Sequence, residues 1–234
     1  MVHGTRVDEA VARLLARIRA GEFTDEPLPR EADLAQESGV SRATLREAVK
    51  VLKTQGVLRV EQGRGTYVNP ITEWESLDLL ATPGPHANRE ELSVQLIQAR
   101  RMIEVGAAEL FAGVCTDDDL ERMRQHLEGM SRADAAGDVG AFVHHDLAFH
   151  DVILQGCGNV FVPLLMRPVS RHLAKARYET SAVPQVRTNA LGQHAAILAA
   201  LRTGDPDASA SAMLGHLRQT DDDLHREILQ RTPA

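Results

Sequence analysis

The chain has 234 residues, of which 43% are hydrophobic and 25% charged, and its net charge is −7; this is the composition of an ordinary globular protein with room for two domains. The longest apolar run, residues 160–166, is far too short to cross a membrane, and two cysteines make neither a disulfide framework nor a zinc motif. Because no charged-then-apolar leader opens the chain, we expect a cytoplasmic protein.

The first 70 residues predict a helix, a second helix, a tight turn, a third helix and a hairpin. Residues 7–20 have apolar side chains at helical spacing and stop before Gly21, and residues 30–40 form a short helix that closes around Gly39. The third helix begins at a capping Ser41 and stops at Gly56, and residues 57–68 are predicted to form two short strands around a glycine turn. This order is typical of a winged helix-turn-helix domain, which we place at residues 1–70.

Residues 71–91 are predicted to be a linker, because their prolines and glycine break any long periodicity; a short helix fits around residues 74–80. Residues 92–230 predict helices throughout, with one helix starting at Thr116 and residues 160–178 forming one broken helix or two. The sequence therefore predicts a mainly α protein, in which an all-α antiparallel bundle follows the winged domain.

The charge supports this division. Residues 1–70 carry 11 basic and 10 acidic side chains, whereas the remaining residues carry 15 and 23. Within the third helix, the basic residues fall on one outward face, and Glu47 is the single acid between Ser41 and Gly56; the basic residues are Arg42, Arg46, Lys50 and Lys53. A solvated charged face is the plain alternative, but a basic helix behind a tight turn and before a wing is suited to the major groove of DNA.

Residues 28–68 resemble the DNA-binding domain of GntR-family bacterial transcription regulators. The Leu-Pro start, the Val-Ser-Arg turn, the Leu-Arg-Glu-Ala helix and the Gly-Arg-Gly-Thr wing match in order. The resemblance implies a wing tip at Gly65 near the minor groove and base or phosphate contacts from four residues, namely Ser41, Arg42, Thr44 and Arg46. The chain departs from the family at Ala32, where an arginine is common; a contact expected there is missing or comes from Arg30.

In the predicted bundle, four polar residues lie on apolar helix faces. Asp146 and His150 are four positions apart on one face, and His194 and His216 lie on apolar faces of two later helices. One such histidine is usually a satisfied core residue, and an isolated buried carboxylate costs several kcal/mol unless it is paired or bound to a cation. Three histidines and an acid together favour a site for zinc, nickel, copper or iron rather than calcium or magnesium.

This half resembles the metal-containing FCD ligand-binding domain of FadR-type GntR regulators. The family pattern of an Asp-three residues-His pair followed by one histidine on each of two later helices is filled by Asp146, His150, His194 and His216. The Gly-Asn pair at residues 158–159 also matches. The resemblance implies a divalent metal, for which zinc or nickel is our preference on ligand type. FadR itself lacks this cluster, so a fatty-acid effector is not implied.

Arg100 also lies on an apolar stripe, whereas Arg101 is expected to turn outward beside Glu104. A guanidinium that faces a bundle core needs an anion. The anion is either an acid of another helix or the carboxylate of a small effector that also reaches the metal. Residues 100–104 resemble the Arg-x-x-Leu-Glu motif of relatives that respond to small organic acids, which favours an effector-binding role for Arg100.

Three functions fit these patterns. The first is a transcription regulator that binds an operator as a homodimer under the control of a small carboxylate effector. The second is a regulator that senses the metal ion itself. The third is a metal-dependent hydrolase fused to a DNA-binding module, but the chain has no HExxH motif and no second acid at metal-ligand spacing. We therefore expect a regulator and not an enzyme.

Overall fold

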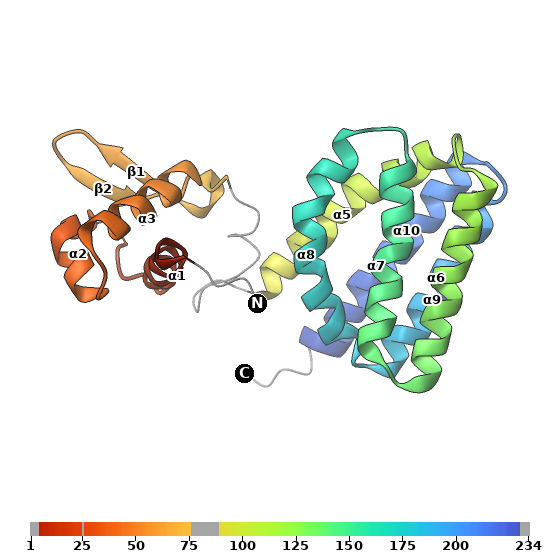
Figure 1. Cartoon of the computed structure of the whole chain (residues 1–234). Coiled ribbons are helices and arrows are strands. Elements are labelled where there is room, and N and C mark those ends of the chain that lie inside the picture. Colours follow the sequence, from red (N-terminus) through yellow and green to blue (C-terminus); the bar gives the residue numbers. More distant parts are fainter. Residues whose placement is uncertain (1–4, 25, 76–88, 230–234) are drawn as a thin grey trace. The chain divides into compact units, whose positions relative to one another are not determined.

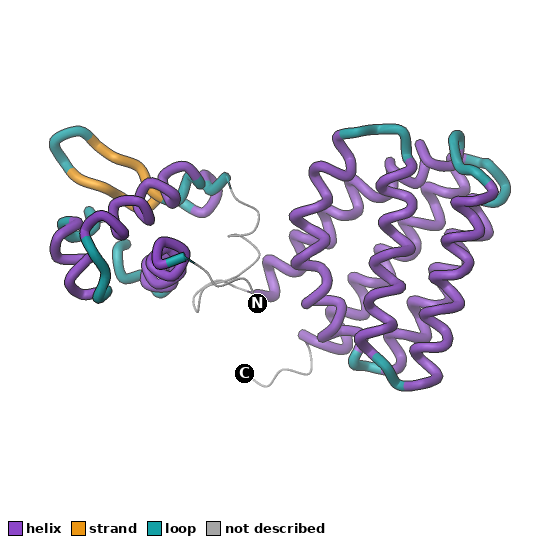
Figure 2. Tube along the Cα trace, viewed as in Figure 1, coloured by secondary structure: helices purple, strands orange, loops and turns teal. Residues whose placement is uncertain are grey.

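The computed structural model describes residues 5–24, 26–75 and 89–229 and divides the chain into two compact units, residues 1–89 and 90–234. Figures 1 and 2 show that the second unit is built of helices joined by short loops, whereas the strands of the first unit form a small hairpin. The helix that fits residues 74–80 falls mostly outside the described residues. Among the described helices, none is long and apolar enough to cross a membrane.

The first unit has the predicted winged helix-turn-helix order. Its elements are α1 (Arg6–Arg19), α2 (Glu31–Glu37), α3 (Arg42–Thr54), β1 (Leu58–Glu61) and β2 (Gly65–Val68). Helix α3 begins at Ser41, whose hydroxyl accepts a hydrogen bond from the Thr44 backbone N–H over 3.0 Å. A small apolar core with Leu34, Leu45 and Leu52 at its centre joins the helices to β1.

The wing is an antiparallel hairpin in which Leu58 pairs with Val68 and Glu61 with Gly65. Gly65 has a φ of 137°, and a Cβ atom there would lie 2.9 Å from the Cβ of Pro27. This glycine is therefore required by the close approach of the chain before α2. The Leu28 N–H also donates to the Thr66 carbonyl over 2.7 Å, which fastens the same chain segment to β2.

The segment after the wing is bonded to the end of α3. The Glu75 N–H donates to the Gln55 carbonyl over 2.9 Å, and the Asn69 side-chain amide donates to the Gly56 carbonyl over 2.8 Å. Between them lies a short 3₁₀ turn, η1 (Ile71–Glu73). Gly56 has a φ of 71°, and a Cβ atom there would clash with the Glu73 carbonyl. Gly56 thus ends the helix and also lets this segment pass over it.

The second unit is an all-α bundle, as predicted. Its helices are α5 (Arg89–Ala112), α6 (Asp117–Ala136), α7 (Val139–Gly156), α8 (Phe161–Ser181), α9 (Pro184–Leu201), α10 (Pro206–Asp223) and the π-helical η2 (Leu224–Leu229). Helix α6 starts at Thr116, which forms a capping box with Asp119. Residues 161–181 form one continuous helix, so the expectation of one broken helix or two is wrong.

The packing of this bundle follows the chain order. Helix α6 packs on α7 and α9, α7 packs on α8, and α9 packs on α10 (Figure 1). The core between them includes Phe111, Phe149 and Ile197, none of which is exposed to solvent. The polar site described below lies within this core, where the surrounding apolar side chains exclude water.

We expect Gly156→Ala and Gly106→Ala to change stability in opposite directions. A Cβ atom at position 156 would clash with the ring of Phe111, which is fully buried, and such overpacking destabilises a protein by roughly 1–3 kcal/mol. At position 106 a Cβ atom would meet nothing within 4 Å, so alanine there should stabilise α5 by roughly 0.5–1 kcal/mol. Calorimetric unfolding of the full chain checks both. Equal melting temperatures for the two variants would contradict the close contact between Phe111 of α5 and Gly156 of α7.

Candidate metal centre

Three helices bring the predicted histidines together in the core of the bundle. His150 of α7, His194 of α9 and His216 of α10 are buried, with ring centroids 4.7–5.0 Å apart. One nitrogen from each ring lies within 4.8 Å of the others. Asp146, also buried, places its Oδ1 atom 3.0 Å from His194 Nε2. All four residues singled out from the sequence therefore lie in one cluster, which we call the histidine–aspartate cluster.

The protonation of His194 leaves a lone pair at the centre of this cluster. Its Nδ1 atom lies 2.7 Å from the Ala190 carbonyl oxygen, an acceptor, so Nδ1 carries the proton. Burial, followed by the nearby His150 and Arg177, lowers the pKa of His194 well below its usual value, so the ring is neutral. The bare Nε2 atom thus faces a carboxylate oxygen, and two acceptors at 3.0 Å repel each other unless a cation lies beside both.

The other two histidines also place a ring nitrogen where a cation would satisfy it. Among the described residues, the Nε2 atoms of His150, His194 and His216 are all buried without a hydrogen-bond partner. Burial also lowers the pKa of His216 well below its usual value. Three imidazole nitrogens without hydrogen-bond partners beside a carboxylate form a donor set that suits a transition metal ion. These residues fit a metal ion.

Glu104 of α5 contacts the Nδ1 side of the His150 ring. Its Oε2 atom lies 2.9 Å from His150 Nδ1, and a carboxylate beside one ring nitrogen is the usual second partner of a metal-bound histidine. Its Oε1 atom accepts a 2.6 Å hydrogen bond from Arg100 Nε. Burial by itself raises the pKa of Glu104, but Arg100 and His150 outweigh it and hold that pKa well below its usual range.

The expectation that Glu104 turns outward is wrong, since only 1% of it is exposed. Arg100 is buried as expected, but its acid partner is on the same helix, four residues later, and not on another helix. The apolar stripe predicted on α5 comprised Leu96, Ile103, Ala107 and Leu110; Ala107 is buried as expected, but Leu110 is 49% exposed, and Ala108 and Phe111 are buried instead. Ala108 and Phe111 were the sequence signal that could have placed Glu104 inward.

Arg177 of α8 is a site residue that the sequence did not predict. One of its terminal nitrogens is in close ion-pair contact with Asp146 Oδ2, and its side chain is only 12% exposed. The signal was its position on the inward stripe of α8, where it follows Met166, Ser170 and Leu173 at helical spacing.

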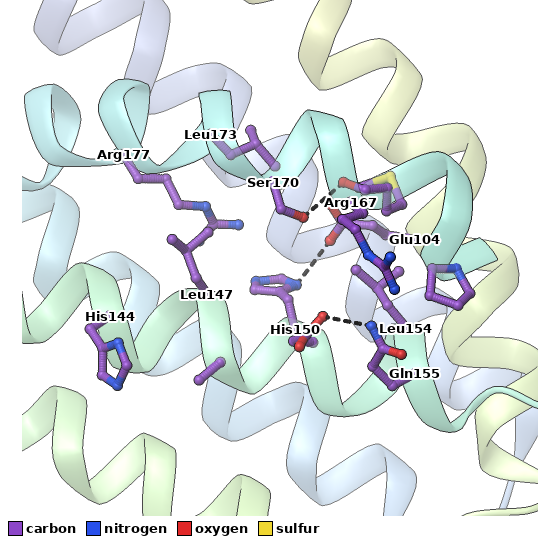
Figure 3. A pocket seen from close by; sticks show the side chains of 14 residues that line it. Glu104, His144, Leu147, His150, Leu154, Gln155, Arg167, Ser170, Leu173 and Arg177 are labelled. Carbon is purple, nitrogen blue, oxygen red and sulfur yellow. Dashed lines mark hydrogen bonds and ion pairs between the residues drawn. The ribbon is translucent and has the colours of Figure 1, made fainter. Parts of the chain in front are cut away.

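A pocket of about 410 Å³ opens beside the cluster between α7 and α8. Figure 3 shows His150 at its centre, with Glu104 on the α5 side and Arg177 and Arg167 on α8. His194, His216 and Arg100 do not line it. His150 is therefore the ring through which the cluster meets the pocket, and Arg100 reaches the pocket only through Glu104.

The DNA-binding candidates lie at the start of α3 and in the wing. Arg42 and Arg46 are exposed, and Arg46 makes a 3.3 Å ion pair with Glu31 of α2. Ser41 and Thr44 are bonded to each other as part of the helix cap. The wing tip lies at residues 62–64 and not at Gly65, which pairs with Glu61 inside the hairpin; Arg64 at the tip has a side chain that is 77% exposed.

Both halves of the chain match known families. Residues 6–68 match the gntR family of bacterial regulatory proteins, and residues 95–219 match the FCD domain. The chain is 32% identical to the HTH-type transcriptional regulator LutR of Bacillus subtilis (strain 168), over 82% of this chain and 88% of LutR. It is 30% identical to the putative L-lactate dehydrogenase operon regulatory protein of Escherichia coli (strain K12), over 81% of this chain and 74% of that relative.

A solved structure agrees with these matches. The Streptococcus agalactiae GntR structure is 29% identical, with a TM-score of 0.53, and the match covers 92% of this chain and 99% of that one. The matched families and relatives are transcription regulators and not enzymes, which leaves the hydrolase alternative without support. This chain therefore belongs to the GntR family of bacterial regulatory proteins, as a DNA-binding transcription regulator whose C-terminal half is an FCD domain.

Proposed function

We propose that this regulator binds its operator as a homodimer and that a small carboxylate effector, bound beside a divalent transition metal in the FCD domain, controls its operator affinity. One observation carries the proposal: three buried imidazole nitrogens without hydrogen-bond partners among the described residues lie together beside the buried carboxylate of Asp146, next to a pocket. Asp146, His150, His194 and His216 would hold the ion. Nitrogen and oxygen donors of this kind suit zinc or nickel.

The ion, when bound, supplies a positive charge that attracts an effector carboxylate. The protein's own residues orient the site: Glu104 fixes the ring of His150, and Arg100 fixes Glu104 through hydrogen bonds of 2.6 and 3.3 Å. We propose that Arg100 acts on the effector through this chain and not by direct contact. A relative named for an L-lactate dehydrogenase operon supports a small organic acid as the effector class.

An effector of this kind changes operator affinity only if it binds one arrangement of the dimer more tightly than another. The test is operator binding by fluorescence anisotropy, titrated first with zinc or nickel alone and then with the metal and a panel of organic acids. The proposal expects a response that requires both. A full response to metal alone would identify a metal sensor instead. Sedimentation of the free protein tests the homodimer, and a monomer at the concentrations that saturate the operator would contradict it.

Arg42→Ala is expected to weaken operator binding, because Arg42 is exposed at the start of α3 and has no ion-pair partner among the described residues. A base-reading arginine contributes on the order of 1–3 kcal/mol and sets sequence preference, whereas a phosphate contact mainly affects the salt dependence. Operator and unrelated DNA are compared by anisotropy at two salt concentrations. The matched control is Arg101→Ala, which removes an exposed arginine from the other unit. Equal affinities for the two variants would rule out α3 as the reading helix.

A further inference from the structure

The pocket beside the histidine–aspartate cluster has two arginines on its wall. Arg167 and Arg177, both from α8, line it on either side of His150 (Figure 3). They are ten positions apart, which is roughly 15 Å along a helix. Two guanidiniums on one wall provide two separate binding points for anionic groups, because each presents several N–H donors in a planar fork.

Arg177 is the cation nearest the cluster. One of its terminal nitrogens contacts Asp146 Oδ2, but its Nε atom is buried and has no hydrogen-bond partner among the described residues. A buried N–H without an acceptor is unfavourable by roughly 1–3 kcal/mol, so this donor is suited to an acceptor that the chain itself does not provide. An oxygen atom of a ligand in the pocket would lie beside both Arg177 and Asp146.

Arg167 is the second cation. It lines the pocket, and in the described part of the chain no hydrogen bond or ion pair involves it. The nearby polar side chains have other partners: Ser170 donates to the Met166 carbonyl, and Asp151 accepts from Gln155 over 3.3 Å. Arg167 is therefore an unpaired positive charge that faces the same space as His150.

Among the described residues, the charges around the pocket balance before any ion is bound. The described residues that line the pocket or pair with its lining include three arginines (Arg100, Arg167 and Arg177) and three acids (Glu104, Asp146 and Asp151). A divalent metal ion on the histidine–aspartate cluster adds two positive charges without a matching acid. Charge in a partly water-excluded site requires a counter-charge close by. A ligand with two negative charges restores the balance, and a monoanion leaves half of the surplus.

We infer that the effector is a dicarboxylate, whose first carboxylate lies at the metal and Arg177 and whose second lies at Arg167. The spacing of the two arginines on α8 requires several carbons between the carboxylates, and the pocket of about 410 Å³ has room for such a chain. This inference rests on the proposed function, in which one carboxylate of the effector lies at the metal. It adds that a second carboxylate of the same effector binds Arg167.

The test compares matched acids on the zinc-loaded full chain by isothermal titration calorimetry. The pairs are succinate with butyrate, glutarate with pentanoate and adipate with hexanoate. At least one dicarboxylate is expected to bind about tenfold or more tightly than its partner, the factor that one charge-assisted hydrogen bond contributes. Arg167→Gln should reduce the dicarboxylate to the affinity of the monocarboxylate and leave the monocarboxylate unchanged. Arg177→Gln should weaken both, and Arg101→Gln should change neither.

The outcomes separate the inference from the proposed function. If each dicarboxylate binds no more tightly than its matched monocarboxylate, or if Arg167→Gln leaves their ratio unchanged, the inference is overturned and a monocarboxylate effector stands. If neither kind of acid binds the zinc-loaded protein, the proposed function fails with it. Because Arg167 is exposed and unpaired among the described residues, its variant should fold normally, and a circular dichroism spectrum checks this.

Discussion

His194→Ala is expected to abolish tight metal binding and with it the metal-dependent part of the protein's stability. His194 is completely buried, and its ring lies 5.0 Å from that of His150 and 4.7 Å from that of His216. Loss of an outer-sphere partner alone weakens metal binding by roughly 10- to 100-fold, and loss of a ligand should exceed that. A ligand present at about 1,000 times its dissociation constant stabilises the folded state by about 4 kcal/mol, and this contribution disappears.

The measurement is elemental analysis together with melting temperatures, for protein purified without a metal-binding tag. Wild type should contain about one divalent ion per chain and lose melting temperature when a strong chelator is added, as a structural metal site requires. In His194→Ala the chelator should have no effect. The control is His225→Ala, because the side chain of His225 is 49% exposed and lies outside the cluster. A wild-type protein that contains no metal and takes up neither zinc nor nickel would refute the site.

Glu104→Ala is expected to destabilise the second unit by about 3–5 kcal/mol, the usual effect of removing one partner of a buried ion pair. Arg100 is 1% exposed and bonds to both oxygens of Glu104, so the variant leaves a buried guanidinium without its anion. The double variant Arg100→Ala, Glu104→Ala should be less destabilised than the two single variants predict by addition, because it leaves no unpaired charge.

Calorimetric unfolding of metal-free protein measures these differences without a contribution from the ion. The control is Glu109→Ala, which removes an exposed acid from the same helix. If the single and double variants are strictly additive, Arg100 and Glu104 do not depend on each other in the folded state, and the proposed positioning of His150 through this pair is incorrect.

Much of the fold could be predicted from local sequence. Ser41 and Thr116 are recognisable as helix starts because a side-chain oxygen that caps free backbone N–H groups is a property of a few adjacent residues. The course of residues 161–181 could not be settled in this way. Whether a proline breaks a helix depends on how the neighbouring helices pack against it, and here the chain continues as a single helix.

The candidate site could likewise be predicted only in part from local sequence. The histidine–aspartate cluster could be identified because each member interrupts an apolar face of its own helix. Glu104 and Arg177 were missed, because each lies near other charged residues on its helix and the apolar neighbours that mark its inward position are a weaker signal. Arg177 pairs with Asp146 on another helix, and the helical phase that turns Glu104 inward differs from the one that Leu110 suggested.

The bonds between the segment after the wing and the end of α3 have a mechanical consequence for the DNA-binding unit. Because Glu75 is hydrogen-bonded to Gln55, and Asn69 to Gly56 and Val57, a force applied to the chain at residue 75 is transmitted directly to α3. These hydrogen bonds bypass the hairpin, so bending of the hairpin does not absorb the displacement. A displacement of residue 75 therefore acts on the unit at the C-terminal end of α3. Gly56 lets the two segments lie in direct contact there, because no side chain separates them.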